Sequence, residues 1–85
     1  MQQYVSSNRI GENIRRVREK HGMRAVEVIA KLLVDYDYEI SSHDFSRIEK
    51  NQLGVSLELV SKLICLFNST YKELVLGMFD DDKNS

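Results

Sequence analysis

The fold is decided by residues 41–51, which read Ser-Ser-His-Asp-Phe-Ser-Arg-Ile-Glu-Lys-Asn. Ser41 and Ser42 are both good helix caps, because a serine hydroxyl accepts a hydrogen bond from a backbone N–H of the first turn. Phe45 and Ile48 stand three residues apart and therefore share one face of a helix. We predict a helix from Ser42 to about Lys50 that packs by this apolar face. Its outward side chains would be Ser42, His43, Asp44, Ser46 and Arg47.

Four more short helices are predicted around this one. Residues 10–21 carry Ile10, Ile14, Val17 and His21 at helical spacing, with Ser7 or Asn8 as a cap and Gly22 as a stop. A second apolar set over residues 26–33 indicates a helix that starts near Arg24 or Ala25. Ser56 is expected to cap a helix that carries Leu57–Phe67, and Thr70 with Glu73 forms a capping box for the last one.

Residues 34–40 alternate branched or aromatic residues with acids, as a strand does. Seven isolated residues do not make a stable strand, so we expect an extended loop into which the second helix runs.

Length and composition bound the answer further. The 85 residues contain no proline and are 42% hydrophobic, which favours one small all-α domain. We assign residues 8–79 to this domain, residues 1–7 to an N-terminal arm and residues 80–85 to an acidic flexible tail. No stretch approaches the ~18 apolar residues of a membrane span, and no secretory signal is recognisable, so we expect a cytoplasmic protein. The single cysteine, Cys65, is expected in the core.

Charge is unevenly distributed although the net charge is only −1. Residues 8–31 hold seven basic and three acidic side chains, whereas residues 35–49 hold five acids and one arginine. The basic third is either a surface that faces phosphates or, more simply, a solvated helix face.

The order of these features resembles the phage repressor and Cro-like (XRE-type) helix-turn-helix family. The resemblance covers about residues 8–77 and rests on five short motifs in the right order. They are residues 10–23 (first helix and turn), 28–32 (second helix), 46–51 (end of the recognition helix), 56–60 and 66–74 (last two helices). It implies a compact five-helix, lambda-repressor-like DNA-binding domain with an extended connection between the second and third helices.

The function implied by the resemblance is sequence-specific binding of double-stranded DNA by a transcriptional regulator, as a dimer with the third helix in the major groove. Family positions that touch base edges correspond to Ser42, His43, Asp44 and Arg47. Positions near phosphates correspond to Arg24, Ser46, Asn51 and Gln52. Arg18 and Glu49 match a structural ion pair between the first and third helices. The candidate dimer surface is the last helix with Leu76, Met78 and Phe79, and the expected location is the cytoplasm, at the nucleoid.

A second interpretation starts from the departures from the family. Ala25 replaces a polar residue that commonly touches a phosphate, and the connection over Leu33–Glu39 is several residues longer and acidic. The domain could instead be a protein-interaction module that contacts a regulatory partner through the acidic surface of residues 35–44. Tyr36 and Tyr38 would then lie in the contact, because tyrosine is enriched in interface cores.

An enzyme is not expected. The sequence has no Cys/His set at ligand spacing, no glycine-rich phosphate loop and only two distant histidines. We accordingly expect no metal, no cofactor and no small-molecule substrate.

Overall fold

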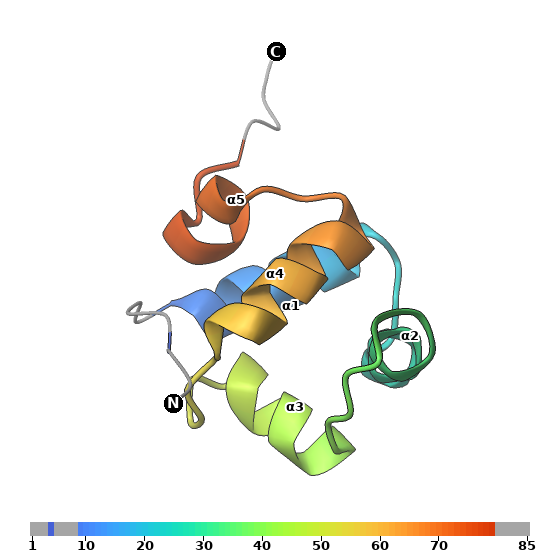
Figure 1. Cartoon of the computed structure of the whole chain (residues 1–85). Coiled ribbons are helices and arrows are strands. Elements are labelled where there is room, and N and C mark those ends of the chain that lie inside the picture. Colours follow the sequence, from blue (N-terminus) through green and yellow to red (C-terminus); the bar gives the residue numbers. More distant parts are fainter. Residues whose placement is uncertain (1–3, 5–8, 80–85) are drawn as a thin grey trace.

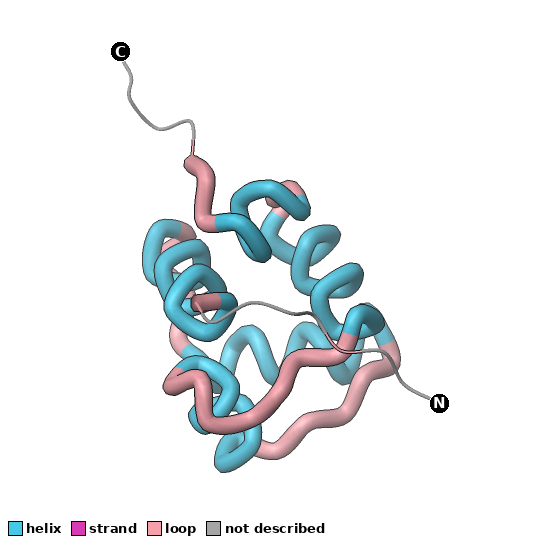
Figure 2. Tube along the Cα trace, turned by 90° about the vertical axis from the view of Figure 1, so that its left-hand side faces the viewer, coloured by secondary structure: helices cyan, strands magenta, loops and turns pink. Residues whose placement is uncertain are grey.

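The computed structural model describes Tyr4 and residues 9–79. This part of the chain contains five helices: α1 (Ile10–Lys20), α2 (Ala25–Tyr36), α3 (Ser42–Glu49), α4 (Leu57–Phe67) and α5 (Tyr71–Leu76). Loops connect the helices (Figure 2). Tyr4 and Ser56 form an isolated β-bridge. The fold is therefore all-α over the described residues. The acidic tail lies outside the described residues, as does the predicted arm except for Tyr4. The predicted caps Ser7 and Asn8 also lie outside them.

The main helix contacts form a closed ring (Figure 1). α1 packs on α3 and α5, α4 packs on α2 and α5, and α2 packs on α3. One core fills the ring, and the described residues contribute fourteen buried apolar side chains to it, among them Ile14, Leu32, Phe45, Leu63 and Leu74. None of these helices combines the length and the apolar sequence that are needed to cross a membrane.

Side-chain caps begin three of the helices. The hydroxyls of Ser41, Ser56 and Thr70 each accept a hydrogen bond from the backbone N–H three residues on, at 3.1 Å. The predicted starts of α3, α4 and α5 are confirmed. A cap of this kind satisfies one of the N–H groups that a helix leaves without an intrahelical partner.

The connection between α2 and α3 differs from the prediction. Residues 34–36 continue α2 as helix instead of forming an extended loop, and the helix ends where Asp37 adopts a left-handed conformation with φ of 53°. The backbone N–H of Tyr38 then donates to the carbonyl of Leu32 at 2.9 Å. Much of the expected insertion thus lengthens α2, and only residues 37–41 connect it to α3.

The expectation for Cys65 is wrong, because this side chain is exposed. α4 buries Leu59, Val60, Leu63 and Phe67. Cys65 lies two residues from both Leu63 and Phe67, which turns it to the opposite side of a helix with 3.6 residues per turn.

Candidate functional site

α3 is held against the core by the two side chains that the sequence indicates. Phe45 is fully buried and Ile48 is 2% exposed. On the outer side Ser42, His43 and Ser46 are exposed. Arg47 is half-buried, with a guanidinium nitrogen 3.5 Å from the backbone carbonyl oxygen of Gln52. The outer face of α3 is thus short and polar, with one arginine near its end.

Asp44 differs from its predicted neighbours. It is half-buried and lines a hollow of about 290 Å³ beside α3, together with Tyr38, Glu39, Leu53 and Ser56. Asp44 is four residues before Ile48, which lines the same hollow, so both lie on one flank of α3. The expectation that all five polar residues face outward is therefore wrong for Asp44.

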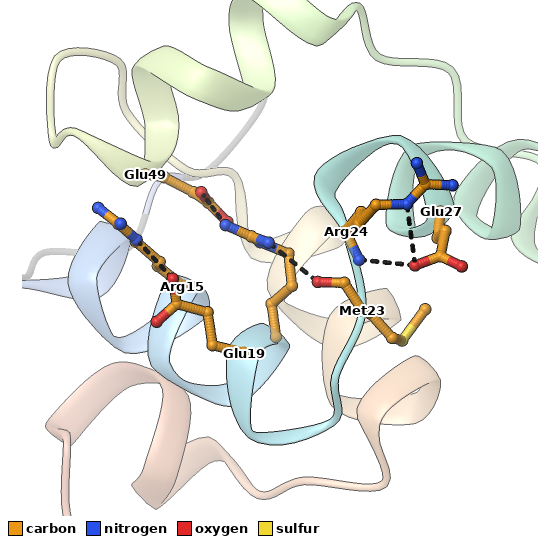
Figure 3. Close-up of polar contacts among 7 residues, drawn as sticks. Arg15, Glu19, Met23, Arg24, Glu27 and Glu49 are labelled. Atoms are coloured by element: carbon orange, nitrogen blue, oxygen red, sulfur yellow. Dashed lines mark hydrogen bonds and ion pairs between the residues drawn. The ribbon is translucent and has the colours of Figure 1, made fainter.

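A bidentate ion pair joins α3 to α1. The guanidinium of Arg18 donates to the two carboxylate oxygens of Glu49 at 2.7 and 3.0 Å, and the side chains are 14% and 10% exposed. A further nitrogen of Arg18 donates to the carbonyl of Met23 at 2.9 Å (Figure 3). The predicted pair is confirmed, and it also reaches the turn between α1 and α2. Arg18 therefore fixes α3 relative to the start of α2.

The same contact changes the acidity of Arg18. The hydrogen bonds to Glu49 and the negative charge of its carboxylate raise the pKa of the Arg18 guanidinium above its ordinary value, while burial acts in the opposite direction. The guanidinium is thus charged throughout the pH range in which a protein stays folded.

A second contact between α1 and α3 was missed by the sequence reasoning. The side-chain oxygen of Asn51, which follows the end of α3, accepts a hydrogen bond from the backbone N–H of Gly11 at 2.9 Å. A Cβ at position 11 would overlap the backbone oxygen of Ile48, so only glycine allows this approach. Asn51 is in the left-handed conformation with φ of 59°. The oxygen of this predicted phosphate contact is thus engaged within the fold, although the residue is exposed.

The start of α2 is a mixed rather than a purely basic site. Arg24 is exposed, as expected for a phosphate contact. However, the carboxylate of Glu27 accepts a hydrogen bond from the backbone N–H of Arg24 at 2.7 Å, and it lies 3.8 Å from the Arg24 guanidinium (Figure 3). An anion that approached this helix end would meet Glu27 as well as Arg24.

The basic third of the chain is largely neutralised by its neighbours. Among the described residues, these ion pairs join basic side chains of residues 8–31 to acids: Arg9 with Glu12, Arg15 with Glu19, Arg18 with Glu49, Arg24 with Glu27 and Lys31 with Asp35. Four of these pairs join residues three or four apart along one helix, or along its first turn. This arrangement is typical of a solvated helix face.

The candidate protein-contact residues are distributed over two places. Tyr38 packs against the core, and its hydroxyl lies 3.5 Å from that of Ser56, while Tyr36 is half-buried. At the other end of the domain Met78 is 55% exposed. Phe79 packs against the core, with the Arg16 guanidinium 4.0 Å from the centre of its ring. Phe79 is therefore largely used within the chain.

Groups of three or more side chains suited to hold a metal ion are not found among the described residues. Comparisons with protein-family models, with curated proteins and with solved structures found no match. The function must therefore be inferred from the geometry of this chain.

Proposed function

We propose that this protein binds double-stranded DNA in a sequence-dependent way and acts as a transcriptional regulator, with α3 in the major groove. The observation that carries the proposal is the way α3 is presented. It is a short helix whose inner face is anchored by Phe45 and Ile48 and whose outer face is polar. A B-DNA major groove admits one such helix.

Rigid presentation supports the proposal. The Arg18–Glu49 pair, the Arg18–Met23 contact and the Asn51–Gly11 hydrogen bond tie both α3 and the start of α2 to α1. Readout of base edges requires side chains whose helix does not shift, because hydrogen bonds weaken steeply when their geometry is poor.

Roles within this interface follow from position. Arg47 is the residue best suited to a guanine, whose N7 and O6 accept two hydrogen bonds from a guanidinium. Ser42 and His43 are exposed on the first turn of α3 and would meet neighbouring bases. Ser46, Gln52 and Arg24 would contact phosphates, and Asn51 could use its amide nitrogen, since its oxygen is engaged with Gly11.

Selection from a random duplex library tests this proposal. The wild-type protein should enrich one motif, and Arg47→Ala should lose the preference at one base pair and bind the best site about 1–3 kcal/mol more weakly. Lys62→Ala removes a positive charge from α4 and is the matched control, with an unchanged base profile. Identical base preferences for Arg47→Ala and wild type would show that Arg47 does not read a base.

A second candidate is supported by the hollow beside α3. Glu39 and Asp44 line it together with Tyr38, and neither carboxylate forms an ion pair with another described residue. Such a hollow suits a basic side chain of a regulatory protein. The library selection separates the two candidates, because a domain used only for protein contacts would enrich no duplex and would show negligible binding even at low salt.

A further inference from the structure

α2 carries more apolar side chains than its packing against the rest of the domain buries. Nine of its twelve residues are apolar or aromatic, yet only Val28 and Leu32 are buried. Val26, Leu33 and Val34 are 53%, 50% and 79% exposed. A helix that is apolar nearly all round is normally covered on most of its surface. Within the described part of the chain, α2 thus has no neighbour on its outer side.

The exposed apolar residues form one stripe. Val26, Ala30, Leu33 and Val34 stand at the i, i+4, i+7 and i+8 positions, which share a helix face. This outer α2 stripe faces away from α3 and α4, against which the other side of α2 packs. Figure 1 shows α2 at the edge of the domain, where a second helix can approach it.

Two opposite charges border the stripe. Glu27 and Lys31 are four residues apart and follow the stripe on the side of Val34, whereas Arg24 and Asp35 lie on the far side of the helix from Leu33. Reversal of the helix exchanges the places of Glu27 and Lys31, so this pair of opposite charges complements itself.

We propose that a second copy of this chain covers the outer α2 stripe, with the two α2 helices antiparallel about a two-fold axis. In the register that places Val26 of one copy beside Val34 of the other, Glu27 of one copy lies next to Lys31 of the other, displaced by only ~3 Å along the axis, which is less than one helical turn. A two-fold axis makes each contact twice, so the same register buries the stripe and forms two ion pairs between the copies.

The rearrangement that this dimer needs is small. Within one chain, Arg24 lies 3.8 Å from Glu27 and Lys31 lies 3.7 Å from Asp35, with all four side chains about half exposed or more. Such surface pairs contribute little, so an exchange of partners between copies is not opposed by them. The candidate surface near α5 offers less, because α5 has only six residues and Phe79 packs against its own core, which leaves Tyr71, Leu76 and Met78 exposed.

Charge reversal without DNA tests the dimer, so its outcome is independent of the proposed DNA binding. Glu27→Lys alone sets the introduced ammonium group against Lys31 of the other copy, and Lys31→Glu alone sets the introduced carboxylate against Glu27. Each variant should dimerise about ten- to one-hundred-fold more weakly than wild type in sedimentation equilibrium. An equimolar mixture should form a heterodimer with near wild-type affinity, because each of the two facing pairs at positions 27 and 31 then joins a lysine to a glutamate.

The mixture controls for damage to the fold. Glu27 also caps the backbone N–H of Arg24, so Glu27→Lys weakens the start of α2. Mixing cannot repair a defect within one chain, and restored association must come from the interface. Val34→Ser should also weaken the dimer, whereas Leu76→Ser, at a comparably exposed apolar position, should leave it unchanged. A monomeric wild type at high concentration, association of either variant that matches wild type, or a mixture that fails to associate would each overturn the proposal.

Discussion

α2 and α3 are consecutive helices with similar anchors and opposite outer faces. Each packs through two fully or almost fully buried apolar residues, Val28 and Leu32 in α2 and Phe45 and Ile48 in α3. Outside this anchor α3 presents serines, a histidine and an arginine, whereas α2 presents valines and a leucine. Side chains of the first kind suit the polar edges of a nucleic acid, and those of the second kind suit another protein surface.

The two helices also differ in how they are braced. α3 is tied to α1 by the Arg18–Glu49 pair and, at its end, by the contact between Asn51 and Gly11. Among the described residues, α2 has no comparable bidentate bridge to another helix, and its charged side chains pair within the helix or with its cap. Polar bracing is thus concentrated on the helix that we propose to read bases. Substitutions can therefore distinguish the contribution of the inner contacts to stability from the contribution of the outer faces to binding.

The largest effect is expected at the bridge under α3. Arg18→Ala leaves the Glu49 carboxylate largely buried without its cation and should lower the free energy of unfolding by about 3–5 kcal/mol. Arg15→Ala is the matched control, because Arg15 and Glu19 are 62% and 55% exposed and such a pair is worth ~0.5 kcal/mol or less. Urea denaturation measures both. Equal, small losses would show that the bridge does not hold α3.

A smaller effect is expected where α1 and the end of α3 approach each other. Gly11→Ala forces a Cβ onto the backbone oxygen of Ile48 and should cost about 1–3 kcal/mol through displacement of α3. Gly22→Ala meets no atom within 4 Å, but its φ of +66° costs an L-residue about 1–2 kcal/mol. Thermal unfolding measures stability, and duplex binding separates the two variants. Gly11→Ala should also weaken DNA binding, while unimpaired binding by this variant would mean that the position of α3 does not matter for it.

The smallest effect on stability is expected on the outer faces. Val34→Ser and His43→Ala alter exposed positions of α2 and α3, and each should change the free energy of unfolding by no more than about 0.5 kcal/mol. Their functional effects should differ: Val34→Ser reduces self-association, and His43→Ala reduces binding to the selected duplex. A variant that loses both self-association and duplex binding would contradict the assignment of these two properties to different faces.

Much of the fold could be predicted because its signals are local. Ser41, Ser56 and Thr70 cap helices through hydrogen bonds to residues three positions away, and the apolar spacing of residues 10–21 or 57–67 determines which face is buried. The ion pair between Arg18 and Glu49 is not local, and it is predicted only through the resemblance to a family.

The missed features depend on how helices meet. Nothing near Gly11 in the sequence indicates that the oxygen of Ile48 approaches it, and nothing near Asn51 indicates that its side chain turns to α1. The sequence predicts an outward Asp44 because helical periodicity defines the inner face but not which flank adjoins a hollow. Residues 34–36 follow the helix rather than the alternating pattern, since the apolar run of α2 continues through Val34 and the break comes at Asp37.

The division between the two outer faces is tested most directly by titrating the labelled protein with its selected duplex and following backbone amide signals by NMR. The largest shifts are expected at Ser42, His43, Ser46 and Arg47, with smaller ones near Arg24 and Gln52 and none of comparable size at Ala30 or Leu33. Largest shifts on the outer α2 stripe, with the signals of α3 unmoved at saturation, would contradict the assignment of α3 as the reading helix.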